Sequence, residues 1–115
     1  QVNAVVARAP DLAGIFGANL FSAIGSADGV KAMGKSGEIK VVAFDAPTRI
    51  VDDLKSGLVD MAIAQHPAEI GYMGVMVAFG HVTGNPVPVS VGTGFTVMTA
   101  DNIDDPDISK YVYSD

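Results

Sequence analysis

Apolar residues recur along the chain with two different spacings. Positions three or four residues apart are typical of amphipathic helices, and they predict helices from the start of the chain to Ala9, over Leu20–Met33, after Asp45–Pro47 and over Ala68–Val82. Short apolar or β-branched runs between these helices predict strands over Leu12–Phe16, Ile39–Phe44, Leu58–Ala64 and, in a longer extended stretch, Val87–Met98. This alternation indicates an α/β layer in which crossover helices join parallel strands.

The two ends of the chain add one expectation each. The first residues carry Val2, Val5 and Val6 at helical spacing with no capping residue before them, so we expect the sequence to begin partway through a larger protein. Near the other end, Asp101–Pro106 has the composition of a turn. We expect it to cap a short final helix and not to bind a cation, because it lacks the calcium-loop pattern.

Each of the first three predicted strands is followed by an amide or a carboxylate before the next helix. These residues are Asn19, Asp45 and Gln65. Ligands of open parallel sheets bind outside the carboxyl ends of the strands, so we expect the three side chains to converge on one crevice. Such a set donates to and accepts from several hydroxyl groups at once, which favours a sugar or polyol as the ligand.

A purely structural interpretation of the same residues is open at this stage. Asn and Asp are preferred N-cap residues, so Asn19 and Asp45 are also candidates to cap the helices that follow them. Gln is a poor cap, which leaves a binding role and a structural role equally open for Gln65.

Longer stretches of the sequence resemble a known family. They are Pro10–Asn19, Gly34–Ser36, Val41–Asp45, Met61–Gly71, Thr93–Thr99 and Asp101–Pro106. They extend over nearly the whole chain and resemble the C-terminal part of the periplasmic sugar-binding proteins of ABC importers, the ribose-binding-like type I solute-binding family. The resemblance implies a parallel-sheet, Rossmann-like α/β fold of the periplasmic-binding-protein type I class, with only its C-terminal portion present.

The resemblance also implies a site and a division of the chain. In that family an Asn, an Asp and a Gln at these strand ends hydrogen-bond the sugar, which places ligand binding on Asn19, Asp45 and Gln65. Two lobes are expected to close on the ligand around a hinge. Residues 1–66 would be βα units of the second lobe, residues 67–86 a crossing helix to the first lobe, and residues 87–115 the return strand and the C-terminal tail. Leu20 departs from the family, whose members usually carry an acidic residue there, which leaves the exact sugar open.

The implied function is capture of a sugar or sugar alcohol in the periplasm and its delivery to the membrane subunits of an ABC permease. No catalysis, cofactor or metal is expected. The missing N-terminal part of the same protein, or another copy of the chain, is the expected partner of the exposed surfaces. A sugar-sensing effector domain of a LacI-type transcription regulator is the alternative, because such regulators share this fold. A signal peptide upstream would support transport, and a helix-turn-helix upstream would support regulation.

The composition argues against several other classes of protein. A net charge of −6 at pH 7 gives no electrostatic footprint for nucleic acid. The sequence contains no cysteine, which removes disulfides and thiolate metal sites. The uncharged stretch Ile70–Gly80 is too short to span a membrane.

Other chemical signals in the sequence are weaker. Gly29–Ser36 matches the phosphate-loop pattern G-x-x-x-x-G-K-[ST]. We expect no nucleotide binding there, because this segment is predicted to end a helix and precede a strand, the reverse of the required order. His66 and His81 lack the spacing of a metal pair. We interpret His81 as an exposed residue at a helix end and His66 as a loop residue, with a place at the rim of a ligand site beside Gln65 as the alternative. An α/β enzyme with Asp45 as general base is a formal alternative.

Overall fold

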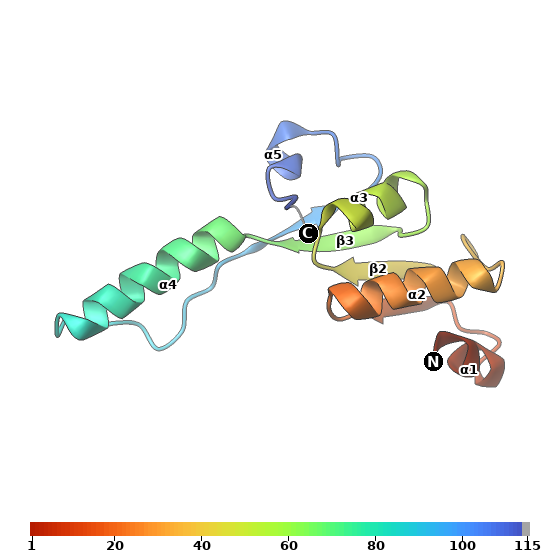
Figure 1. The fold of residues 1–115 in the computed structure, drawn as a ribbon, viewed down its shortest axis with the longest axis horizontal. Helices are drawn as coiled ribbons and strands as arrows, with labels where there is room; N and C mark the ends of the chain where they lie inside the picture. Colours follow the sequence, from red (N-terminus) through yellow and green to blue (C-terminus); the bar gives the residue numbers. More distant parts are fainter. Residues whose placement is uncertain (114–115) are drawn as a thin grey trace.

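The computed structural model describes residues 1–113, in which helices alternate with strands (Figure 1). The helices are α1 Val2–Arg8, α2 Leu20–Ala32, α3 Thr48–Lys55, α4 Pro67–Val82 and α5 Pro106–Ser109. The strands are β1 Gly14–Gly17, β2 Lys40–Phe44, β3 Met61–Gln65 and β4 Phe95–Met98. The predicted α/β class is confirmed, and so is the short final helix, which Asp105 caps by accepting a hydrogen bond from the Asp107 amide.

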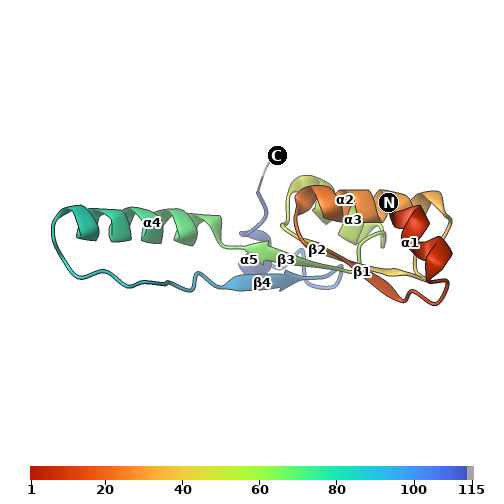
Figure 2. The ribbon, with the colours of Figure 1, turned by 90° about the horizontal axis from the view of Figure 1, so that it is seen from below.

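The strands form one sheet in the order β1-β2-β3-β4. The pairs β1–β2 and β2–β3 are parallel, as expected, but β4 runs antiparallel to β3, with Val97 opposite Ile63. The expectation of parallel strands is therefore wrong for the last one. The reason is visible in Figure 2: α4 carries the chain away from the sheet, and residues 83–94 bring it straight back along the helix. A strand that returns from that side enters the sheet in the opposite direction.

Two predicted strands are longer than the observed ones. Leu58 and Val59 are buried but belong to a turn, because their amides donate to the carbonyl oxygen of Asp53 and close the end of α3. Residues 87–94 are extended beside α4 and belong to no strand, so strand pairing begins only at Phe95.

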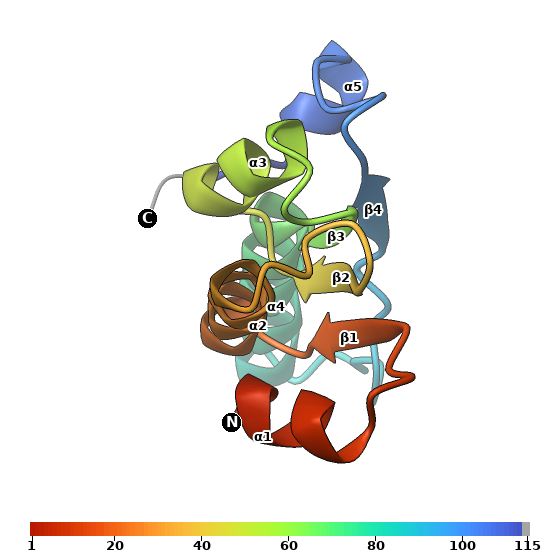
Figure 3. The ribbon, with the colours of Figure 1, turned by 90° about the vertical axis from the view of Figure 1, so that its right-hand side faces the viewer.

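The core lies between the sheet and the helices on one of its faces. Figures 2 and 3 show α2 and α3 on the same side of the strands. The strand residues that point toward them are small or medium-sized and fully buried, namely Val41, Ala43, Ala62, Ala64 and Met98. The side chains on the other face include Phe16, Phe95 and Val97, which are 55%, 66% and 38% exposed. We call this second surface the bare sheet face.

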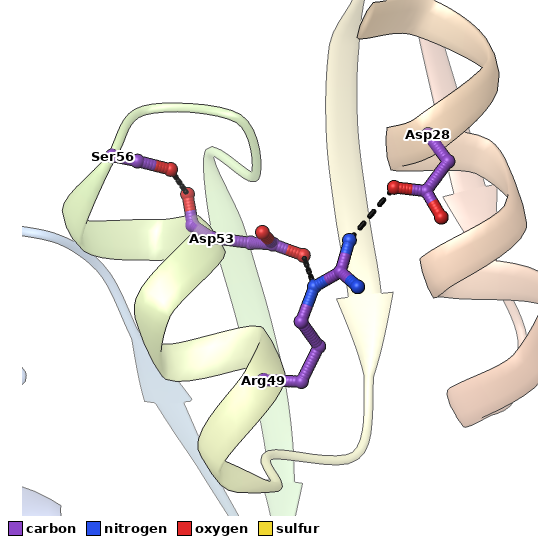
Figure 4. Close-up of polar contacts among 4 residues, drawn as sticks. All are labelled: Asp28, Arg49, Asp53 and Ser56. Carbon is purple, nitrogen blue, oxygen red and sulfur yellow. Dashed lines mark hydrogen bonds and ion pairs between the residues drawn. The ribbon is translucent and has the colours of Figure 1, made fainter.

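An ion-pair cluster joins the two helices above the core (Figure 4). Arg49 of α3 donates through Nε to Asp53, at 2.9 Å, and through a terminal nitrogen to Asp28 of α2, at 2.7 Å. The hydrogen bond to Asp53, followed by the one to Asp28, raises the pKa of Arg49 above its usual value. A planar guanidinium reaches two carboxylates at once, which fixes the spacing of α2 and α3.

The helix α4 and the returning residues 83–94 project together from the rest of the molecule as an extension, which we call the arm (Figure 1). The sheet with α1, α2, α3 and α5 is the body. No residue of α4 is buried, and the long axis of the molecule measures 56 Å against 32 and 21 Å for the others. Among residues 1–113, no helix combines the length and the apolarity that a bilayer crossing needs.

Candidate ligand-binding site at the strand ends

The ends of β1, β2 and β3 bring three polar residues to one edge of the sheet. Asn19 precedes α2, Asp45 follows β2, and Gln65 is the last residue of β3. The carboxylate of Asp45 accepts hydrogen bonds from two sides: Oδ1 from the side-chain amide of Gln65, at 2.6 Å, and Oδ2 from the backbone amide of Leu20, at 3.3 Å. The side chains of Asp45 and Gln65 meet, whereas that of Asn19 is hydrogen-bonded to neither, so the convergence of all three on one crevice stays a prediction.

Asn19 is the N-cap of α2 and has an exposed side chain. Its amide oxygen accepts from the backbone amide of Ser22, at 2.9 Å, and the Ser22 hydroxyl accepts from the Asn19 backbone amide, at 3.1 Å. This reciprocal pair is a capping box, so the N-cap role expected for Asn19 is confirmed. The cap uses the amide oxygen and leaves the two side-chain N–H groups of Asn19 as potential donors to a ligand.

Asp45 does not cap the helix that follows it. The N-cap of α3 is Pro47, which makes no side-chain cap hydrogen bond. Asp45 has φ of 80°, the left-handed region that Asp tolerates better than most residues. Its amide still donates to Ile63 on β3, while its carboxylate accepts from Leu20 at the first turn of α2, where negative charge is favourable. The expectation that it caps α3 is therefore wrong, because this conformation directs the side chain to a different helix.

Gln65 lies at the point where the body meets the arm. Its side chain is half-buried, and it borders a hollow of about 420 Å³. The other residues around this hollow are Pro67, Ile70, Gly71 and Tyr113. The hollow thus presents an amide beside apolar and aromatic surface, which is the combination that small-molecule sites use.

His66, the next residue, has more partners than the sequence indicated. Its Nε2 is 2.8 Å from the hydroxyl oxygen of Thr96, and its Nδ1 is 3.1 Å from a carboxylate oxygen of Glu69. Its ring stacks on Tyr111, with centroids 3.8 Å apart and 12° between the planes. Its position in the loop before α4 is as predicted, but its side chain is held on several sides. The sequence contained no signal for this, because Thr96 and Tyr111 are far away along the chain.

The remaining sequence signals lie away from this edge. The segment Gly29–Ser36 spans the end of α2 and precedes β2, in the order that the sequence predicted, and Lys35 forms an ion pair with Glu38. His81 is exposed in the last turn of α4, as expected. Within residues 1–113 no group of His, Asp and Glu side chains is arranged to hold a metal ion.

Solved structures similar to this chain include solute-binding proteins of sugar transporters. An ABC transporter solute-binding protein from Agrobacterium vitis, bound with α-D-tagatopyranose, is 61% identical, with a TM-score of 0.93; the match covers 100% of this chain and 39% of that one. A second solute-binding protein from Agrobacterium vitis, with bound D-fucose, is 32% identical, with a TM-score of 0.87 and coverage of 98% and 39%. A carbohydrate transporter solute-binding protein from Agrobacterium radiobacter, in complex with D-arabinose, is 28% identical, with a TM-score of 0.86 and coverage of 97% and 38%.

These matches cover nearly all of this chain but less than half of each relative. The chain spans about two fifths of the length of these solved proteins. A comparison with curated protein sequences finds no match. The family described as periplasmic binding protein domain matches residues 1–86, which include the whole edge formed by Asn19, Asp45 and Gln65. The parallel strands, their helices on one face and this family match lead to one assignment: the chain belongs to the periplasmic binding protein domain family.

Proposed function

We propose that the chain is the C-terminal part of a solute-binding protein that captures a sugar or sugar alcohol in the periplasm and delivers it to the membrane subunits of an ABC importer. The family match and the 61% identity to a tagatose-bound solute-binding protein support this assignment. The chain would bind its ligand and release it unchanged. Because the identity is highest to that relative among those described above, D-tagatose is the first ligand to test.

The proposal rests on the two hydrogen bonds that the Asp45 carboxylate accepts at the strand ends. One carboxylate holds the Gln65 amide and the first turn of α2 in place, so the polar groups at three strand ends have fixed positions. Sugars are recognised by several donors and acceptors at defined spacing, because each hydroxyl both donates and accepts. A preorganised set of amides and a carboxylate meets that need without a cofactor.

The division of the chain follows from the same proposal. Residues 1–66 would form βα units of one lobe, residues 67–86 a helix that crosses to the other lobe, and residues 87–115 the return strand and tail. The projection of the arm from the body (Figure 1) supports this division, and the arm also has apolar surface of its own. A ligand between the lobes would touch the strand ends on one side and groups of the first lobe on the other.

Calorimetric titration of the complete protein tests the proposal. We expect saturable binding of D-tagatose, or of another member of a panel that includes D-fucose, D-arabinose and D-mannitol. Replacing Asp45 with Ala removes the acceptor for two donors, and we expect it to weaken binding by about 2 kcal/mol or more. Asp52→Ala is the matched control, because Asp52 is an exposed carboxylate on α3.

Two results would contradict the proposal. The wild-type protein could fail to bind every sugar and polyol of the panel while remaining folded. Alternatively, Asp45→Ala could bind the sugar as tightly as the wild type and the Asp52→Ala control do.

A further inference from the structure

Within residues 1–113, burial of α4 does not fix the orientation of the arm. No residue of α4 is buried, and the groove between α4 and the returning chain is lined by residues of the arm itself, from Ile70 to Thr93. The arm is connected to the body where the chain passes from β3 into α4 and where it returns into β4 (Figure 2). Within the described residues, the contacts that orient the arm on the body therefore lie at these two crossings and where the C-terminal segment borders the start of α4.

His66 touches both crossings and a third segment. It lies in the first crossing, between β3 and α4, and its Nδ1 is paired with Glu69 in the first turn of α4. Its Nε2 is hydrogen-bonded to Thr96 of β4, which is the start of the body after the second crossing. Its ring stacks on Tyr111, which follows α5. One side chain thus connects the two crossings with the segment that follows α5.

Gly94, in the second crossing, leaves space for the ring of His66. Gly94 has φ of 71°, and a Cβ added there would lie 3.3 Å from Nδ1 and 3.4 Å from Cε1 of His66. Glycine adopts this conformation without strain and leaves room for the ring. The side chain of His66 is accordingly only 12% exposed although it lies in a loop.

The hydrogen bonds of His66 can be satisfied with either one or two ring protons. The carboxylate of Glu69 only accepts, so Nδ1 donates to it, whereas the hydroxyl of Thr96 accepts from a protonated Nε2 or donates to a bare one. The other titratable groups nearby are Tyr111 and Lys110, whose Nζ lies 5.3 Å from the centre of the Tyr111 ring. Both contacts therefore form with the tautomer that carries its proton on Nδ1 and accepts from Thr96 at Nε2.

We propose that His66 is the positioning residue of the junction between body and arm. It fixes the angle of the arm and thereby the direction in which the adjacent Gln65 presents its amide at the strand-end site. The role of Gln65 toward a ligand rests on the proposed function, whereas the restraint on the arm does not.

Distance measurement between spin labels tests the restraint in the complete protein without ligand. The 115 residues contain no cysteine, so labels at Lys31→Cys on α2 and Val82→Cys at the end of α4 report the arm against the body. We expect His66→Ala to broaden the distance distribution about twofold, and Thr96→Val, which removes only a hydroxyl, to broaden it less. We expect His66→Gln, which keeps a polar group near Thr96, to restore part of the narrow distribution.

Two comparisons make the readout specific. His81→Ala makes the same chemical change on the exposed end of α4 and should leave the distribution as in the wild type. The double variant His66→Ala/Thr96→Val should be no broader than His66→Ala, because the two residues act through one contact. D-tagatose titration of the same proteins is expected to give about threefold to tenfold weaker binding for His66→Ala, since Gln65 is less preorganised.

The outcomes separate this proposal from the proposed function. An unchanged distribution in folded His66→Ala or Thr96→Val overturns the positioning role, whatever the sugar titration gives. A broadened distribution in a protein that binds no sugar upholds the positioning role and contradicts the proposed function. Should His66→Ala lose its fold, the milder Thr96→Val variant decides between the two results.

Discussion

The side chain of Asn19 can cap α2 and bind a ligand at the same time, because it carries an acceptor and two donors. The oxygen accepts from Ser22 and caps α2, while the N–H groups are left for the ligand. Asp45 likewise has two tasks. Its carboxylate accepts a hydrogen bond from the Leu20 amide, which is a structural contact, and another from Gln65, which is itself a proposed binding residue. Substitutions that keep one task and remove the other can therefore separate folding from binding.

For Asn19, we expect Ala and Ser to have different effects. Asn19→Ala removes the cap and should lower the free energy of unfolding by about 1 kcal/mol. Asn19→Ser keeps a good capping oxygen and should leave the stability near that of the wild type, but it lacks the amide donors and should weaken sugar binding about fivefold to tenfold. Urea unfolding and calorimetry of both variants check this. Equal sugar affinity of Asn19→Ser and the wild type would remove Asn19 from the site.

For Asp45, the informative change is to Asn. The new amide can donate to Gln65 after the Gln65 side chain flips, while its oxygen still accepts from Leu20, so we expect the free energy of unfolding to change by less than about 1 kcal/mol. Sugar affinity should fall by about 1.5–3 kcal/mol, because the charged acceptor is lost and the Gln65 amide is reversed. Loss of stability without loss of affinity would mean that Asp45 is only structural.

The sequence predicted these positions better than their contacts. The Asn19 cap follows from local sequence, since its partner Ser22 is three residues away. The partner of Asp45 at Leu20 is not local: it depends on the register of β1 beside β2 and on the left-handed backbone at Asp45. His66 was underestimated for the same reason, because its partner Thr96 becomes a neighbour only when β4 returns antiparallel to β3.

Close packing of β1 against α2 depends on a single glycine. A Cβ added at Gly17 would lie 2.4 Å from Cα and 2.5 Å from the backbone nitrogen of Ala23, and neither atom can move without shifting the helix. This contact brings the start of α2, and with it Asn19, against the end of the sheet.

Two glycine substitutions test this packing with opposite expected signs. Gly17→Ala should destabilise the protein by about 3 kcal/mol or prevent folding, because the added methyl overlaps backbone. Gly25→Ala, in the exposed part of α2 with nothing within 4 Å of the new Cβ, should stabilise it by about 0.4–1 kcal/mol. Thermal unfolding of both variants is the measurement. A Gly17→Ala protein as stable as the wild type would mean that β1 and α2 are not packed as described.

At the level of elements, the sequence predicted helices and parallel strands where hydrophobic spacing was regular. It did not predict the direction of β4, because spacing within a strand is the same in parallel and antiparallel pairs. The arm was also not evident, since Ile70, Val75 and Phe79 of α4 are as apolar as core residues although they are 40%, 68% and 62% exposed.

At the scale of the whole molecule, the described residues expose large apolar side chains on two surfaces. The bare sheet face exposes Phe16, Phe95 and Val97, and the arm exposes apolar residues along α4. Exposed apolar patches and an open sheet edge both favour association. Residues 1–115 prepared alone are therefore expected to associate.

Light scattering on residues 1–115 at micromolar concentration checks this expectation. We expect species larger than a monomer, and we expect Phe16→Lys to shift them toward the monomer by placing a charge on the bare sheet face. Phe21→Lys is the control, because Phe21 is also exposed but lies on α2. A monodisperse monomer that binds sugar with micromolar affinity would show that these residues need no partner to form the site.

The central claim is that the ends of β1, β2 and β3 hold a sugar. A crystal structure of the complete protein with D-tagatose, or with the tightest ligand of the panel, tests it most directly. We expect sugar hydroxyls within about 3.5 Å of the side chains of Asn19, Asp45 and Gln65. A sugar bound elsewhere, with these three side chains in contact only with protein or water, would contradict it.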